Sequence, residues 1–173
     1  MCLILVAWHG HPQYPLFIAA NRDEFHARPA APADWWQDEP RILAGLDLRA
    51  GQPGAGQPRA GQPKARGTWL GLTRDGRFAA LTNFRGAPQR MDADSRGTLV
   101  AELLRSRDTA ALILDHLRRV GPNYNAFNVI FSDGDTIISR DAIGEARFEE
   151  WTWNPDGSPE SVRNFAFRIH TRR

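Results

Sequence analysis

Short apolar runs bounded by turn residues make up most of this sequence, and helical periodicity is confined to one central stretch. The clearest signal is the turn Asp75-Gly76 between two apolar runs, which is the pattern of a β-hairpin. Two helices are expected within residues 95–120, and Asp108 is expected to cap the second one. The predicted strands are residues 3–8, 16–20, 67–73, 78–84, 129–131 and 136–138. Strands, then helices, then strands indicate an α+β fold with antiparallel sheets rather than alternating βαβ units.

The composition is that of a globular chain. Hydrophobic residues make up 42% of the 173 positions, and the single cysteine excludes an internal disulfide and the usual cysteine-based zinc sites. The opening apolar run is too short for a signal peptide or a membrane span, so no stable membrane insertion and a cytoplasmic location are expected. Of the 22 basic residues only Lys64 is a lysine, a bias that suggests a GC-rich bacterial genome.

A low-complexity tract interrupts the chain, in which Ala-Gly-Gln-Pro repeats within residues 50–64. The tract has no apolar face that could build a repeat fold, so we interpret it as a flexible insertion in a surface loop. Basic residues gather there and at the extreme C-terminus, so a nucleic-acid partner is not expected. We expect one domain over residues 1–140 and a divergent, poorly ordered tail over residues 141–173. Residues 30–41, rich in proline, tryptophan and acidic residues, are expected to run over the surface.

The single cysteine is the first chemical candidate, because Cys2 directly follows the initiator methionine. Removal of Met1 would leave a thiol and an α-amine on the same residue. An α-amine has a pKa near ~7.7–8 and can take the thiol proton, so nucleophile and base would sit together. The alternative is that Cys2 is a small buried hydrophobic residue, as most free cysteines are.

A compact polar cluster follows the second predicted strand, Asn21-Arg22-Asp23-Glu24. Four polar residues at one strand end can form a site. They can equally form a buried ion-pair network that clamps the hairpin to a neighbouring loop. Asn83 is polar at the end of another apolar strand, where it could also cap a turn. Both interpretations stay open on the residues alone.

Several short motifs occur in series over residues 1–131, and together they resemble the NRDE-motif family, also called the transport and Golgi organization family. The motifs are Met1-Cys2, Asn21-Arg22-Asp23-Glu24-Phe25 with Arg28-Pro29, Gly67-Thr68-Trp69-Leu70-Gly71, Ala80-Leu81-Thr82-Asn83-Phe84, Ser95-Arg96-Gly97 and Tyr124-Asn125-Ala126-Phe127-Asn128. The family is similar to N-terminal nucleophile hydrolases, and most closely to the branch that includes penicillin V acylases and bile-salt hydrolases. This resemblance implies a four-layer αββα sandwich of two antiparallel sheets.

The resemblance also implies roles for four residues. Cys2 matches the nucleophile, and Arg22 and Asp23 resemble the pair that positions the terminal amine and thiol. Asn83 resembles the side-chain donor of the oxyanion hole, a group typically worth roughly 3–4 kcal/mol of transition-state stabilisation.

Beyond residue 140 the sequence departs from the family, because the expected Gly-Leu-Ser-Asn motif is not found. We therefore expect a sandwich that is incomplete at its C-terminal end. The function implied is an N-terminal cysteine hydrolase or acyl transferase acting on a small amide, thioester or acyl substrate. The alternative is a non-catalytic binding or trafficking protein for a lipid or haem. No cofactor is expected, and the pair His9 and His11 has no obvious third ligand for a metal. The oligomeric state is not indicated.

Overall fold

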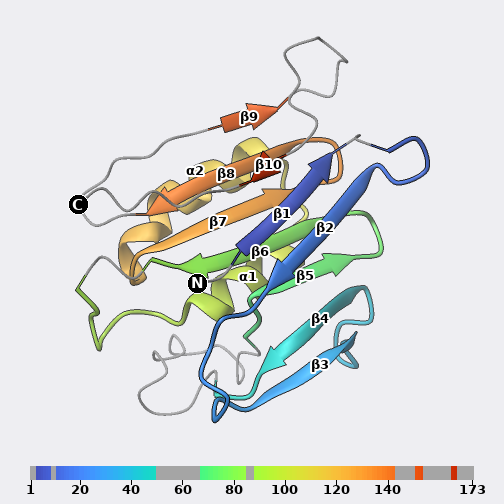
Figure 1. Cartoon of the computed structure of the whole chain (residues 1–173). Coiled ribbons are helices and arrows are strands. Elements are labelled where there is room, and N and C mark those ends of the chain that lie inside the picture. The colour runs from blue at the N-terminus through green and yellow to red at the C-terminus, as the bar shows by residue number, and fades with distance from the viewer. Residues whose placement is uncertain are drawn as a thin grey trace. The chain divides into compact units, whose positions relative to one another are not determined.

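The computed structural model describes residues 3–8, 11–49, 67–84, 88–142, 151–153 and 165–166 (Figure 1). The chain divides into two compact units: residues 1–25 with 153–173 form one, and residues 26–152 form the other. Cys2, the insertion predicted at 50–64 and most of the predicted tail lie outside the described residues. The predicted division at residue 140 stays a prediction.

The first unit contains the hairpin predicted at the start of the chain. Strand β1 (Leu3–Trp8) pairs antiparallel with β2 (Leu16–Asn21) over its whole length, from Leu3 opposite Asn21 to Trp8 opposite Leu16. The short strand β10 (Phe165–Ala166) pairs with the other edge of β1. Exposure alternates along β1, where Val6 is buried and Leu5 is 40% exposed, as expected for successive side chains on opposite faces. The sequence therefore predicted this hairpin correctly.

The second unit is built on an antiparallel sheet with the strand order β3-β4-β5-β6-β7-β8-β9 over the described residues. Its strands are β3 (Ala30–Trp35), β4 (Ile42–Asp47), β5 (Leu70–Thr73), β6 (Phe78–Asn83), β7 (Phe127–Ser132), β8 (Ile137–Ala142) and β9 (Trp151–Trp153). The turns between β5 and β6 and between β7 and β8 each contain a glycine with positive φ, Gly76 at 84° and Gly134 at 106°. An L side chain rarely adopts that backbone conformation, so glycine suits both turns.

Strand β3 adds to the sequence prediction for residues 30–41. This segment does lie at the surface, since most of its side chains are exposed, but its first six residues form a regular edge strand. The pairing of β3 with β4 shifts register between Ala31 and Asp34, and Pro32 lies in that irregular step. Proline lacks a backbone N–H and is tolerated in a sheet at edges and bulges.

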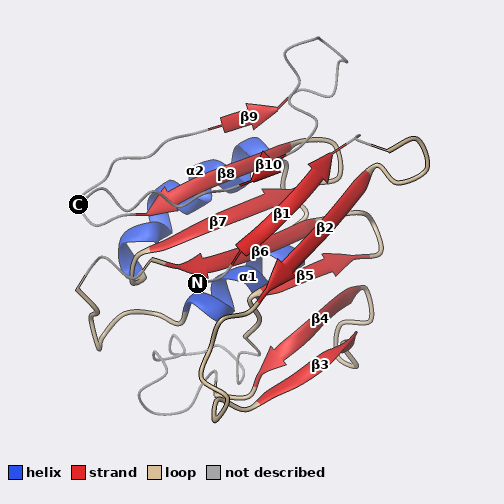
Figure 2. Ribbon diagram, viewed as in Figure 1, coloured by secondary structure: helices blue, strands red, loops and turns tan. Residues whose placement is uncertain are grey.

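Two helices cover one face of this sheet (Figure 2). Helix α1 (Arg96–Arg105) packs on β5 and β6, and α2 (Ala110–Val120) packs on β8. A 3-10 turn, η1 (Gly121–Asn123), leads from α2 toward β7. The core beneath the helices is apolar, with Leu99, Leu104 and Leu117 fully buried. Burial of one leucine side chain contributes roughly 1.5–3 kcal/mol, so the packing of this layer stabilises the unit.

The N-terminus of α2 differs from the predicted one. The N-cap residue is Thr109, whose hydroxyl accepts from the Leu112 N–H, whereas Asp108 donates its own N–H to the Ser106 hydroxyl oxygen. The Asp133 carboxylate, from the β7–β8 turn, accepts from the Ala110 N–H at 2.7 Å. The expected cap at Asp108 was therefore wrong, because a carboxylate distant in sequence and the neighbouring threonine satisfy the helix end instead.

The fold class is confirmed as α+β with antiparallel sheets and few helices. The four-layer αββα arrangement implied by the resemblance stays a prediction.

Candidate functional site

The polar cluster after β2 begins with Asn21, the last residue of that strand. The Asn21 side-chain Oδ1 accepts a hydrogen bond from the backbone N–H of Leu3 at 2.6 Å. Arg22 and Glu24 are half-buried, and Asp23 is exposed. The cluster therefore lies at the end of the hairpin where β1 begins. Strand β1 begins at Leu3, which directly follows Cys2 in the sequence.

Asn83 is the last residue of β6 and its side chain is exposed, although the five residues before it in the strand are buried. It is paired with Phe127 of β7, and the Phe84 N–H donates to the Ala126 carbonyl at 3.1 Å. The Asn128 Nδ2 donates to the Thr82 hydroxyl oxygen at 3.2 Å, which joins the same strand ends through their side chains. Asn83 is therefore the last residue of a strand that is paired up to its end, and its side chain is exposed.

The four predicted site residues are not brought together by what the structure describes. Cys2 lies outside the described residues, and Arg22 and Asp23 belong to the first unit while Asn83 belongs to the second. Their gathering around one pocket stays a prediction.

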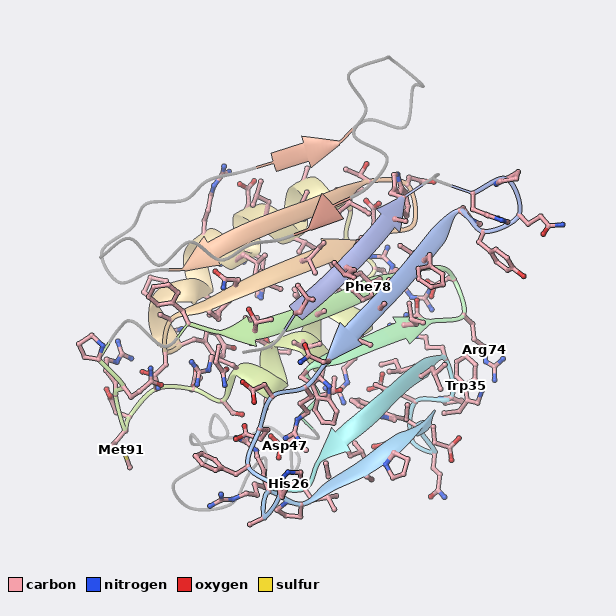
Figure 3. All side chains as sticks on the ribbon, viewed as in Figure 1. His26, Trp35, Asp47, Arg74, Phe78 and Met91 are labelled. Atoms are coloured by element: carbon pink, nitrogen blue, oxygen red, sulfur yellow. The ribbon has the colours of Figure 1, made fainter. Side chains whose placement is uncertain are left out.

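An ion pair that sequence reasoning did not find links the Arg-Pro part of the motif to β4. The Arg28 Nη2 lies 2.5 Å from Asp47 Oδ2, and its Nε donates to Asp47 Oδ1 at 3.4 Å (Asp47 is labelled in Figure 3). The Asp47 side chain is only 11% exposed, and its Oδ1 also accepts from the Arg49 N–H. Arg28 therefore has an acidic partner on β4. Two residues 19 positions apart carry no local signal that they pair.

The glycines of the Gly-Thr-Trp-Leu-Gly motif serve close packing. A Cβ on Gly71 would lie 2.6 Å from Leu104 Cδ1 and 2.9 Å from the Ala44 Cβ, so β5 approaches α1 and β4 only because this side chain is absent. The Thr68 N–H donates to the Gly97 carbonyl at 3.0 Å. A Cβ on Gly97 would lie 3.3 Å from the Gly67 Cα. These contacts bring two of the motifs together and leave no room for larger side chains.

The loop that follows Asn83 is clamped to the segment before β7. The Asn125 side chain accepts from the Arg90 N–H at 2.7 Å and donates to the Arg90 carbonyl at 2.9 Å. The Arg96 Nη1 donates to the Ala126 carbonyl at 2.8 Å. Met91, at the tip of this loop, is 81% exposed (Figure 3). Asn125 and Arg96 thus join the described part of this loop, residues 88–94, and the start of α1 to the segment before β7.

The opposite ends of β6 and β7 hold a charged network. Asp75 lies near Arg107 at 2.9 Å and near Arg41 and Arg77 at 3.7 Å. A hydrogen bond from the Thr73 hydroxyl, then a backbone hydrogen bond and the charges of Arg107 and Arg41, lower the pKa of Asp75 despite partial burial. The Arg77 guanidinium also donates to the Asp108 carbonyl at 2.7 Å, which fastens the α1–α2 loop to the sheet.

Asp133 belongs to the same end of the sheet. Burial opposes ionisation of this carboxyl, but hydrogen bonds from the N–H groups of Ala110, Thr136 and Asp135, together with the charge of Arg77, lower its pKa. At the edge of this region, the Arg74 guanidinium stacks over the Trp35 ring at 3.7 Å (Figure 3). These contacts stabilise turns and a helix end, and they lie at the strand ends remote from Asn83.

A family model described as Transport and Golgi organisation 2 matches residues 1–154. The chain belongs to this family. The Transport and Golgi organization 2 homolog of mouse is 39% identical over 140 residues, which are 79% of this chain and 46% of the mouse protein. The bovine and human homologs are 38% and 36% identical over 154 residues, in both cases 84% of this chain and 51% of the relative. The chain spans about half the length of these curated relatives.

Family membership confirms the resemblance inferred from the motifs of residues 1–131. The relatives named here are mammalian, and the bacterial origin inferred from the arginine bias stays a prediction. No helix among the described residues is long and apolar enough to cross a membrane. Within the same residues, no group of three His, Cys, Asp or Glu side chains is placed to hold a metal ion.

Proposed function

We propose that this member of the Transport and Golgi organisation 2 family is a hydrolase or acyl transferase with Cys2 as its N-terminal nucleophile. The observation that best supports this proposal is the register of the β1–β2 hairpin. Its last pair is Leu3 and Asn21, and the next residues along the two strands are Cys2 and Arg22. The hairpin therefore carries the charged segment Arg22-Asp23 to the end of β1 at which the cysteine is attached.

In the proposed reaction, Cys2 supplies both the nucleophile, its thiol, and the base, its α-amine. The α-amine takes the thiol proton, and the thiolate attacks the carbonyl carbon of a small amide, thioester or other acyl group. The proton then passes from the ammonium to the leaving amine or thiol as the tetrahedral intermediate collapses to a Cys2 thioester. Water or an acceptor nucleophile attacks this thioester and restores the free thiol. In this scheme Arg22 and Asp23 hold the amine and thiol, and Asn83 donates to the oxyanion.

Intact mass spectrometry tests the proposal directly. The purified protein should lack Met1, and incubation with a panel of short-chain acyl thioesters and p-nitroanilides should add one acyl group, which Cys2→Ala abolishes. Retention of Met1 would reject the mechanism, because the amine would then be one residue too far from the thiol. Absence of both a Cys2 adduct and Cys2-dependent release of thiol or p-nitroaniline across the panel would reject the assignment as an acyl-transferring enzyme.

The role of Asn83 is tested by comparing its alanine variant with the alanine variant of a second asparagine, Asn125. Asn83→Ala should leave stability within about 0.5 kcal/mol of wild type, since the side chain is exposed. It should lower turnover of the best panel substrate by about 10²–10³-fold, the usual cost of one oxyanion donor. Asn125→Ala is the control, because it removes two hydrogen bonds to the loop at Arg90 and should lower stability more than it lowers turnover. Equal turnover in wild type and Asn83→Ala would remove Asn83 from the mechanism.

A second candidate is a binding or trafficking protein for a lipid or haem, since the family description names transport and no reaction. Ligand binding by a protein that forms no Cys2 adduct would favour it. For either function we propose a small-molecule substrate or ligand, a cytoplasmic location and no nucleic-acid partner.

A further inference from the structure

The Asn21 side chain makes a hydrogen bond that is not part of the roles proposed for Cys2, Arg22 and Asp23. Its Oδ1 accepts from the Leu3 N–H at 2.6 Å, across the last register pair of the β1–β2 hairpin. The Leu3 N–H is the backbone donor that immediately follows residue 2. A side chain from β2 therefore holds the first described peptide group of β1.

This bond has little reason to exist for stability alone. Asn21 is exposed and Leu3 is 45% exposed, so water could satisfy the same N–H at small cost. The bond restrains the Leu3 N–H, which belongs to the peptide group that joins Leu3 to Cys2 in the sequence. It thereby limits how far the backbone at the start of β1 can move relative to β2.

The chemistry of an amide suits this place better than that of a carboxylate. A carboxylate at position 21 would accept the same N–H, but it would add a second negative charge to that of Asp23, which would oppose ionisation of a nearby thiol and favour the charged form of a nearby amine. Standard bond lengths put an α-amine on residue 2 within about 7 Å of the atom that binds Leu3 N. A neutral acceptor holds the backbone without that electrostatic cost.

We infer that Asn21 is a positioning residue for the terminal cysteine, acting through its hydrogen bond to the Leu3 N–H. This inference rests on the proposed function, because it assigns a purpose to the bond only if Cys2 reacts. Asn21 itself touches neither the substrate nor the thiol in this role.

The test uses two probes of the full-length protein. 2-Cyanobenzothiazole condenses with a free 1,2-aminothiol, so it reports whether Cys2 is the N-terminal residue. Iodoacetamide alkylation, followed by intact mass from pH 6 to pH 10, reports the rate and the pH midpoint of thiol reactivity. Both probes need no natural substrate.

Three variants separate the hydrogen bond from charge and from folding. Asn21→Ala removes the acceptor and should slow alkylation at pH 7.5 by about fivefold, the factor expected for one ordinary hydrogen bond. Asn21→Asp keeps the acceptor and should retain the limiting rate at high pH. Its added charge should move the pH midpoint upward by about half a unit at low salt.

Ala19→Asp is the charge control. Ala19 is opposite Leu5 and two residues before Asn21, so its side chain is on the same face but about 7 Å further along the strand. Because its charge lies further from residue 2 than that of Asn21→Asp, the pH midpoint of Ala19→Asp should shift less than that of Asn21→Asp at the same low salt concentration. Arg22 and Asp23 are unchanged in all three variants and form a constant charged background.

Each outcome tests either the proposed function or the inference on Asn21. A wild-type protein that 2-cyanobenzothiazole does not label rejects the proposed function, and the inference on Asn21 falls with it. A labelled wild type with Asn21→Ala alkylated at the same rate overturns the inference alone. So does an Asn21→Asp variant as slow as Asn21→Ala at high pH, since the restored acceptor would then have no effect. Equal melting temperatures with the expected rates and midpoint support it.

Discussion

Gly71 offers the sharpest test of how the motif residues act, because the space around it is defined on two sides. A Cβ at this position would lie 2.6 Å from Leu104 Cδ1 and 2.9 Å from the Ala44 Cβ. Leu104 is fully buried and Ala44 has no rotatable group to move aside. Gly71→Ala must therefore shift β5 away from α1 or displace Leu104 within a close-packed core. Overpacking of this kind costs about 1–3 kcal/mol.

The loss should be visible in thermal and urea unfolding followed by circular dichroism. For a chain of this length each kcal/mol moves the melting temperature by about 2–4 °C, so Gly71→Ala should melt about 2–12 °C lower. Gly121→Ala is the control, since Gly121 has helical backbone angles and a methyl group added there would meet no atom within 4 Å outside its two chain neighbours. Its stability should stay within about 1 kcal/mol of wild type, because alanine reduces the entropy of the unfolded chain while the ring of Pro122 disfavours helical angles in a preceding alanine.

A double-mutant cycle identifies the contact that causes the loss. Leu104→Ala alone should cost about 2–5 kcal/mol by opening a cavity. Added to Leu104→Ala, Gly71→Ala should cost at least about 1 kcal/mol less than it does in the wild type, since the cavity accepts the new methyl group. Wild-type stability of Gly71→Ala, or strict additivity of the two changes, would refute the packing argument.

Three further predictions concern charge and the insertion. Asp133→Ala should cost about 0.5–2 kcal/mol at pH 7, as loss of a helix-terminal acceptor does. Because the folded-state pKa of Asp133 is depressed below 3.8, its contribution is present above that pH and lost as the pH falls below it. A difference from wild type that stays constant in urea titrations down to about pH 2.5 would contradict this. A double-mutant cycle of Arg28→Ala and Asp47→Ala should give a coupling free energy of unfolding of about 1–2 kcal/mol. A value near zero would show that this ion pair does not contribute to stability. Deletion of residues 50–64 should change the melting temperature by less than about 2 °C, and a drop of many degrees would show that the tract packs.

The predictable part of the fold is the part that local patterns encode. Apolar runs flanking Asp75-Gly76 specify a hairpin because turn chemistry and alternation are both properties of adjacent residues. The helical stripe within residues 95–120 is equally local, and the structure has both helices there. Strand β3 was not recognised as a strand, because an exposed edge strand containing Pro32 has neither an apolar run nor regular alternation.

Contacts between distant residues were not predictable. Asp108 looked like the cap of α2 because it precedes the helix, but Asp133 reaches the same helix end from a turn 23 residues beyond Ala110. Arg28 and Asp47 are brought together by the pairing of β3 with β4, in which Ala30 is opposite Asp47. For the candidate site, the sequence motifs identified the candidate residues and the family. The register of β1 with β2 showed which residues follow the end of the hairpin that is next to Cys2 in the sequence. The contact from Asn21 to Leu3 has no signal in the sequence beyond the presence of an asparagine.

The motif residues divide by what their side chains touch. Gly71 and Gly97 are explained by close approach, and Asn125 by its two bonds to a loop backbone, so none of them needs a chemical role. Asn83 differs, because its side chain is exposed and does not fill space in the core. Packing therefore gives no reason for an amide at this position. A loss of turnover without a loss of stability in Asn83→Ala is the result that a purely structural role would not produce.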